Sequence, residues 1–184
     1  MWPSSGLVST SLRQILTSPA LTIHNSEQSR VRVLIHGENL HTLKETIISH
    51  LVKPEDLQHH GTLFAGRMAE WLVETCFITA SRFVGKPEDI VCVRVHGITF
   101  EKPINNGDIT EIRARVAYAG NTSITIKGQA FTVDSEVPVV SGMVTFVTVD
   151  KHGSPYAHGL SLPQEYISQN REIYEEALKV RGKR

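Results

Sequence analysis

The stretch that decides the fold runs from Leu63 to Val84 and reads LFAGRMAEWLVETCFITASRFV. It is dense in helix formers and apolar almost all round, and its charged residues are Arg67, Glu70, Glu74 and Arg82. A surface helix would carry a broad polar stripe, which this stretch lacks. The composition therefore predicts a long helix buried in the core.

Strand-like runs follow this helix without another helical segment between them. They occupy residues 89–100, 108–120, 122–133 and 137–150, and they are rich in β-branched residues. The junctions between the later runs are short and contain Gly, Asn, Asp or Pro, which is typical of tight hairpins. A buried helix followed by neighbouring antiparallel strands predicts an α+β fold with helices against a single sheet.

The segments on either side complete this plan. RVRVLI at 30–35 and TIISHLV at 46–52 are separated by a segment that contains a His-Gly-Glu-Asn turn, which predicts a hairpin or two neighbouring strands. The tail begins with a proline and then carries Glu and Lys at helical spacings, which predicts a helix. We expect a flexible N-terminal arm at 1–28, one domain at 29–160 and a C-terminal helix at 161–184.

Charge and cysteine content narrow the classes of function. The 19 Lys and Arg residues balance the 19 Asp and Glu residues, so the chain lacks the global positive field that supports non-specific nucleic-acid binding. Cys76 and Cys92 both have apolar neighbours, and we interpret them as reduced core residues. We find neither a secretory leader nor a run of about 18 apolar residues. We expect a cytoplasmic protein that binds neither nucleic acid nor membrane.

Short motifs in the middle of the chain resemble one enzyme family in their order and spacing. They are DLQHHGTLFAGRM at 56–68, FEKPINNGD at 100–108, GNTSITI at 120–126 and VTFVTVDKHG at 144–153. Together they resemble hot-dog-fold acyl-CoA thioesterases of the YciA and cytosolic acyl-CoA hydrolase type. The resemblance covers roughly residues 44–158 and implies a hot-dog fold, in which a curved antiparallel β-sheet wraps around a long central helix.

The family resemblance implies that an acyl-CoA is hydrolysed to a free carboxylic acid and coenzyme A, without a cofactor. This reaction needs a polarised carbonyl and a carboxylate that attacks it or activates water. The N–H of Gly66 at the helix start could polarise the carbonyl, and Gln58 could orient the water or the thioester. The alternatives are that Gly66 only permits close packing and that Gln58 only caps its loop.

The carboxylate departs from the family pattern. The family places an Asp or Glu seven residues after the glycine, where this chain has Val73. Glu74 is the next residue and Glu70 lies one turn earlier on the same helical face, so Glu74 is our first candidate and Glu70 our second. The alternatives are a carboxylate at a dimer interface, or a structural ion pair with Arg67, Arg82 or Arg94.

Other polar residues are candidates for substrate binding by resemblance. His60 and Glu70 could contact the substrate, and the hairpin residues Asn121, Thr122 and Ser123 could bind the phosphates of coenzyme A. Ordinary turn chemistry explains Asn-Thr-Ser equally well. The His59–His60 pair has no further ligand at metal spacing, so we expect no metal site.

Assembly and a second function class also follow from the resemblance. Family members join their sheets in pairs and form active sites between chains, so we expect at least a homodimer, which could extend to a tetramer or hexamer. The alternative function is a non-catalytic acyl-CoA-binding or sensing protein, because Val73 would suit a lost active site. A repressor is disfavoured, since the first 40 residues contain no convincing helix-turn-helix. A dehydratase ranks last, because its motif context is absent.

Overall fold

One antiparallel sheet and one long helix dominate residues 43–182, the part of the chain that the computed structural model describes. The strands are β1 (Thr46–Leu51), β2 (Ile90–Phe100), β3 (Ile109–Ala119), β4 (Ser123–Thr132) and β5 (Val140–Thr148), in the spatial order β1-β3-β4-β5-β2. The helices are α2 (Ala65–Val84), α3 (Gln164–Gln169) and α4 (Arg171–Gly182), with short 3-10 turns η1 (Pro54–Asp56) and η2 (Pro87–Asp89).

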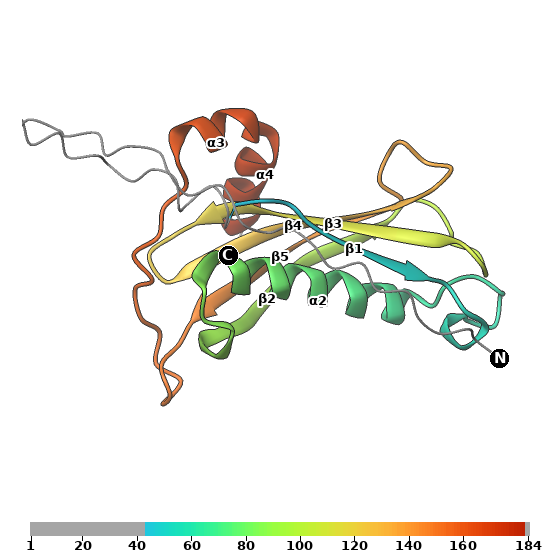
Figure 1. Ribbon diagram of the computed structural model, residues 1–184, viewed down its shortest axis with the longest axis horizontal. Helices are drawn as coiled ribbons and strands as arrows, with labels where there is room; N and C mark the ends of the chain where they lie inside the picture. The colour runs from blue at the N-terminus through green and yellow to red at the C-terminus, as the bar shows by residue number, and fades with distance from the viewer. Residues whose placement is uncertain (1–42, 183–184) are drawn as a thin grey trace, which may run out of the picture. The chain divides into compact units, whose positions relative to one another are not determined.

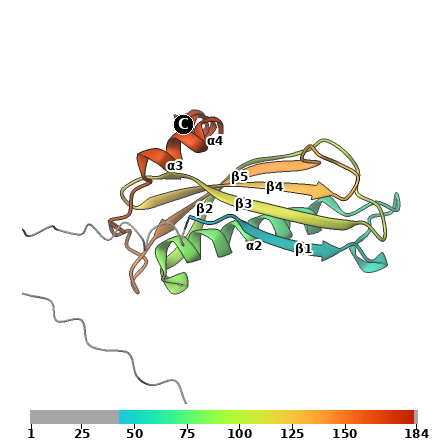
Figure 2. The same ribbon diagram turned by 45° about the horizontal axis from the view of Figure 1, so that its top comes forward.

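The helices lie on opposite faces of the sheet (Figures 1 and 2). We call the face that α2 covers the inner face and the opposite one, where α3 and α4 lie, the outer face. This arrangement confirms the predicted α+β architecture with a long helix against one sheet and a helical C-terminal segment. The predicted hairpin strand at 30–35 and the arm at 1–28 lie outside the described residues.

Alternation along the strands builds the core between α2 and the inner face. In β3 the residues Ile112, Ala114 and Val116 point inward, and they meet the inward residues of β4 and β5. The buried side of α2 carries Met68, Trp71, Leu72, Cys76, Ala80 and Phe83. The apolar stretch 63–84 thus supplies one wall of the core, as its composition predicts.

The helix comes closest to the sheet at a pair of glycines. Gly128 of β4 and Gly142 of β5 are cross-strand partners. A Cβ atom on Gly128 would lie 2.9 Å from Cys76 Sγ, and one on Gly142 would lie 3.2 Å from a methyl group of Leu72. Because both strands carry a glycine at this point, there is space above them for the fully buried side chain of Leu72.

Two expectations about burial were wrong for the single chain. Cys92 is exposed, whereas Cys76 is buried, because β2 is an edge strand that α2 hardly covers. The helix is also not buried all round: Glu70 and Glu74 are exposed on one side. Cys92 is exposed because one helix is too narrow to cover a five-stranded sheet, and the two glutamates are exposed because only one side of α2 faces the sheet.

The C-terminal helix is fixed to the outer face by an apolar contact and an ion pair. Ala177 is fully buried against Ala117 and Met143. Lys127 on the outer face of β4 donates to both carboxylate oxygens of Glu176, at 2.7 and 2.9 Å. None of the helices within residues 43–182 is long and apolar enough to cross a membrane.

Filling the glycine contact should destabilise the fold. We expect Gly128→Ala to lower the free energy of unfolding by about 1–3 kcal/mol, because the new methyl group overlaps Cys76 and Leu72. Urea unfolding measures this change. Adding Cys76→Ala should recover part of the loss, and Gly182→Ala, where a Cβ meets nothing within 4 Å, should cost nothing. Equal unfolding midpoints for Gly128→Ala and wild type would contradict this account.

Candidate functional site

The N-terminus of α2 presents backbone N–H groups that have no internal partner. The Phe64 N–H donates to the Asp56 carbonyl at 2.9 Å, and the Met68 N–H closes the first helical turn on the Phe64 carbonyl at 3.1 Å. The N–H groups of residues 65–67, which lie between Phe64 and Met68 in the chain, have no backbone acceptor within the described residues. Ala65 and Gly66 are exposed. This helix end can therefore donate hydrogen bonds to a developing negative charge.

Gly66 also has a packing role. A methyl group at this position would collide with the ring of Phe64, which lies against it and is 54% exposed. The missing side chain keeps the ring close to the helix start and leaves the Gly66 N–H open. Both of the roles considered for Gly66 are therefore compatible with its surroundings.

Gln58 stands beside this helix end in a tight loop. Its N–H donates to the Thr62 carbonyl at 2.8 Å, and its Nε2 donates to Thr62 Oγ1 at 2.9 Å. Gln58 therefore caps its loop, yet it also lines a cleft of about 240 Å³ together with Thr62, Ala65 and Lys102. Its side-chain oxygen remains available as an acceptor in that cleft.

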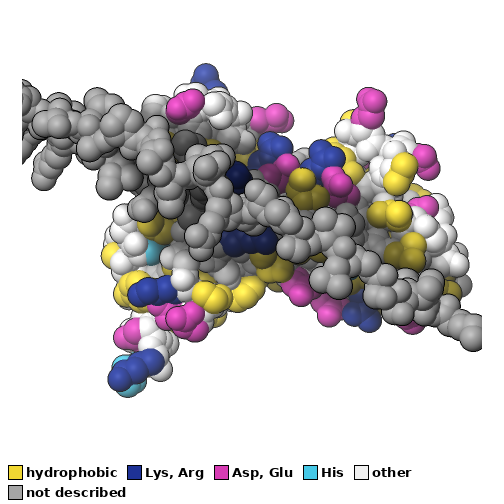
Figure 3. Space-filling view, in the orientation of Figure 1, with side chains coloured by type: hydrophobic (Ala, Val, Ile, Leu, Met, Phe, Trp, Pro, Cys, Tyr) yellow, Lys and Arg dark blue, Asp and Glu magenta, His cyan; other side chains and the backbone are white. Residues whose placement is uncertain are grey.

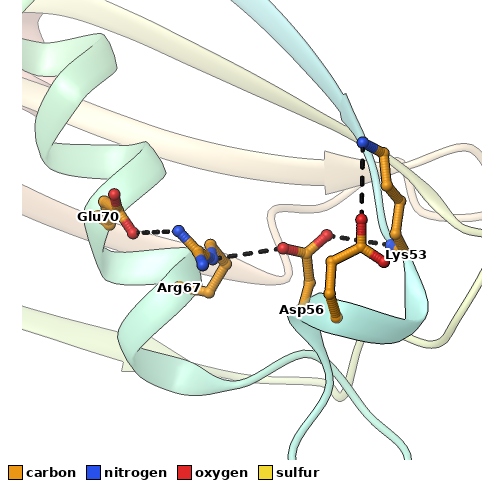
Figure 4. Close-up of polar contacts among 5 residues, drawn as sticks. Lys53, Asp56, Arg67 and Glu70 are labelled. Carbon is orange, nitrogen blue, oxygen red and sulfur yellow. Dashed lines mark hydrogen bonds and ion pairs between the residues drawn. The ribbon is translucent and has the colours of Figure 1, made fainter.

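An ion-pair chain connects the loop before α2 with the first turns of the helix (Figure 4). Asp56, only 9% exposed, accepts from the Lys53 N–H at 3.1 Å and lies 3.3 Å from Arg67 Nε. Arg67 also donates to Glu70 at 2.6 Å. The two carboxylates offset the positive charge that Arg67 places near the helix N-terminus. Glu70 is thus engaged in the structural ion pair that we considered as its alternative role.

Glu74 is exposed, and no hydrogen bond or ion pair of its side chain occurs within residues 43–182. Val73, at the family's carboxylate position, packs partly buried against the core. Eight residues separate Gly66 from Glu74, which amounts to about 12 Å along a helix. A thioester held at the Gly66 N–H is therefore out of reach of Glu74 from the same chain.

The remaining candidates lie apart from the helix start. His60 is exposed at the tip of its loop, where it packs on His59 with ring centroids 3.9 Å apart. The hairpin of Asn121, Thr122 and Ser123 lies near the other end of α2: the Asn121 carbonyl accepts from the His158 N–H, and His158 contacts Phe83 in the last turns of the helix. Burial lowers the pKa of His158. One chain does not bring the hairpin to Gly66.

Asp56 has no role among the expectations from the sequence, and Arg67 has one only as a candidate ion-pair partner of a helix glutamate. A sequence signal for the pair exists, since an acidic residue precedes a helix whose first turn carries an arginine. Lys102 also lines the cleft with Gln58. Across residues 43–182, no cluster of three or more His, Cys, Asp or Glu side chains could hold a metal ion.

Comparisons with known proteins point to one family. The family model described as "Thioesterase superfamily" matches residues 60–139. Acyl-coenzyme A thioesterase 11 of Mus musculus is 28% identical over 130 residues, which is 68% of this chain. The chain spans less than two thirds of the length of the first curated relatives it matches: 22% of the mouse protein and 62% of a Bacillus subtilis protein.

Solved structures agree with this result. An acyl-CoA hydrolase from Staphylococcus aureus, in complex with butyryl coenzyme A and coenzyme A, is 26% identical, with a TM-score of 0.65 over 77% of this chain and 83% of that one. The hexameric thioesterase y2039 from Yersinia pestis is 27% identical, with a TM-score of 0.55 over 66% of this chain and 96% of that one. These likenesses confirm the predicted hot-dog fold.

The two carboxylates around Arg67 should differ in their importance for stability. We expect Asp56→Ala to lower the free energy of unfolding by about 2 kcal/mol, because the Lys53 N–H and Arg67 lose a nearly buried acceptor. Glu70→Ala removes an exposed partner and should cost less than about 1 kcal/mol. Chemical denaturation of both variants measures the difference. Equal losses would show that Asp56 does not anchor the loop.

Proposed function

We propose that this chain, a hot-dog protein of the thioesterase superfamily, hydrolyses acyl-CoA thioesters to a free carboxylic acid and coenzyme A. The observation that carries the proposal is the start of α2. There, unpartnered N–H groups open beside a cleft that Gln58 and Lys102 line. A helix N-terminus of this kind stabilises the oxyanion that forms when a thioester carbonyl is attacked.

The reaction assigns one role to each of the three candidate catalytic residues. The thioester oxygen accepts a hydrogen bond from the Gly66 N–H, and Gln58 orients the carbonyl or the water. The Glu74 carboxylate either takes a proton from the attacking water or attacks the carbonyl itself, with hydrolysis of the resulting anhydride. When Glu74 acts as a base, the C–S bond breaks after water has added to the carbonyl, and the proton that Glu74 took passes to the sulfur, which leaves as the thiol of coenzyme A. When Glu74 attacks the carbonyl, the C–S bond breaks as the anhydride forms, the sulfur takes a proton from solvent and leaves as the thiol, and water then hydrolyses the anhydride.

A second copy of the chain supplies the carboxylate in this proposal. Glu74 lies about 12 Å along the helix from Gly66 in its own chain. Two α2 helices that pack through their exposed sides would place Glu74 of each chain near Gly66 of the other. The lack of any internal partner for Glu74 within the described residues supports this role, because its carboxylate is free for the site.

The surface around β2 suits this assembly. β2 is an edge strand, and its exposed residues include Val91, Val93 and Val95, which are 44, 55 and 44% exposed. A long edge strand with apolar side chains is normally paired or covered. Figure 3 shows Lys and Arg side chains interspersed with Asp and Glu side chains on the face that it presents. A tetramer or hexamer and a cytoplasmic location stay predictions from the sequence.

Glu74→Gln should abolish most of the turnover. We expect coenzyme A release to fall by about 100-fold or more, the loss typical of removing a catalytic acid or base. The assay follows the free thiol over a panel of short, medium, long and aromatic acyl-CoA substrates. Glu70→Gln is the matched control and should retain activity within about tenfold, because Glu70 is engaged with Arg67.

Other outcomes would overturn parts of this proposal. Equal losses of coenzyme A release in Glu74→Gln and Glu70→Gln would contradict the assignment of Glu74 as the catalytic carboxylate. No release from any substrate by the wild type, combined with saturable acyl-CoA binding, would favour the non-catalytic binding protein that Val73 allows.

A charge on the edge strand should break the assembly. We expect wild type to sediment as a dimer or larger and Val95→Asp to shift toward the monomer, because the buried charge would have no partner. Sedimentation velocity measures the distribution, and circular dichroism checks the fold. Val133→Asp, on a loop where the side chain is 83% exposed, should leave assembly unchanged. A monomeric wild type would contradict the shared active site.

A further inference from the structure

A second pocket, on the outer face of the sheet, collects positive charge. It has a volume of about 330 Å³ and lies between β2, the β4–β5 pair and the end of α4. Its polar lining consists of Arg94, His96, Ser123, Thr145 and Arg181. No carboxylate lines it, and Arg94 and Arg181 give it its positive charge.

Arg181 is held in place at this pocket. Its Nη1 donates to Ser123 Oγ at 3.0 Å, and its guanidinium carbon lies 4.2 Å from the centroid of the Tyr118 ring. These two contacts order the long Arg181 side chain before a ligand binds. Binding therefore costs less conformational entropy than it would for a mobile arginine. Ser123 Oγ accepts from Arg181, which leaves its own proton free to donate.

His96 lies in the same pocket. Its Nε2 is 2.7 Å from Thr145 Oγ1, which in turn is 2.8 Å from Thr125 Oγ1. Burial lowers the pKa of His96, and the charges of Arg94 and Arg181 lower it further. The two charged groups that act on this imidazole, Arg94 and Arg181, are both cations. A pocket with an excess of positive charge favours the binding of an anion.

Arg94 and Arg181 differ from Lys127, another cation on the outer face, in having no carboxylate partner within the described residues. Lys127 is neutralised by Glu176 at 2.7 Å. Within the described residues, Arg94 and Arg181 take part in no ion pair. Two guanidinium groups without carboxylates, beside hydroxyl donors, match the requirements of a phosphate better than those of a carboxylic acid, because a phosphate has more acceptor oxygens and more charge.

We propose that this pocket binds a phosphate group, which accepts hydrogen bonds from Arg94, Arg181, His96 and the Ser123 hydroxyl. The phosphate belongs either to the nucleotide part of coenzyme A or to a free nucleotide. In the first case the inference rests on the proposed function, and the pocket would act as its substrate anchor. In the second it is a separate site, because α4, whose Arg181 lines the pocket, lies on the opposite face of the sheet from α2 (Figure 2).

Isothermal titration calorimetry with inorganic phosphate tests the site without any hydrolysis. We expect saturable binding to the full-length protein, and we expect Arg94→Gln and His96→Gln each to raise the Kd about fivefold to tenfold, the effect of losing a charge-assisted hydrogen bond. Lys151→Gln removes a cation from an exposed loop outside the pocket and should leave the Kd within about twofold.

The outcomes separate this inference from the proposed function. No heat of binding up to about 20 mM phosphate, or equal Kd values for the Arg94 and Lys151 variants, would overturn the site, whatever the hydrolysis assay gives. Competition then identifies the source of the phosphate. Displacement of phosphate by coenzyme A but not by dephospho-coenzyme A supports the 3′-phosphate of the substrate. Displacement by adenosine diphosphate but not by coenzyme A supports a separate nucleotide.

Discussion

The close approach of α2 to the sheet at Gly128 and Gly142 is the constraint on which the rest of the structure depends. Leu72 and Cys76 fill the room that these two glycines leave on neighbouring strands. This contact fixes the height of the helix above the sheet near its middle. The N-terminus of α2 then lies against the loop of Gln58, and the exposed side of the helix keeps Glu74 outside the core. A side chain at either glycine would shift all of these features together.

The ion pairs around the start of α2 distinguish Glu70 from Glu74, the two candidate carboxylates on one face of the helix. Arg67 lies between Asp56 and Glu70 and binds both, so Glu70 has a structural partner. Glu74, one turn further along, has none in the described part of the chain. A free carboxylate is the one that can accept a proton from water or approach a carbonyl from a second protomer. Val73, which packs partly buried against the core, occupies the family's usual carboxylate position and cannot supply that group.

The edge strand β2 and the exposed side of α2 both need a second copy of the chain to complete them in the proposed assembly. Each is incomplete alone, because β2 exposes valines and α2 exposes Glu74 too far from its own Gly66. The outer face is organised differently, with α4 covering β3 and β4 through Ala177 and the Lys127–Glu176 pair. Where α4 ends, Arg181 completes a cationic pocket with residues of β2. The two faces of one sheet thus separate the proposed chemistry from the proposed phosphate site.

The sequence by itself determined the α+β architecture, the long helix, the tight hairpin between β3 and β4 and the helical C-terminal segment, because hydrophobic periodicity and turn residues are local signals. The second predicted tight hairpin was wrong, since the β4–β5 connection runs over residues 133–139. It also located Gln58 and Gly66 at the helix entry through a short motif. Only the tertiary structure decided that Cys92 is exposed, that Glu70 binds Arg67, and that the hairpin of Ser123 lies near the far end of α2. These facts depend on which strand lies at the sheet edge and on contacts between distant segments, and periodicity along one segment carries no information about either.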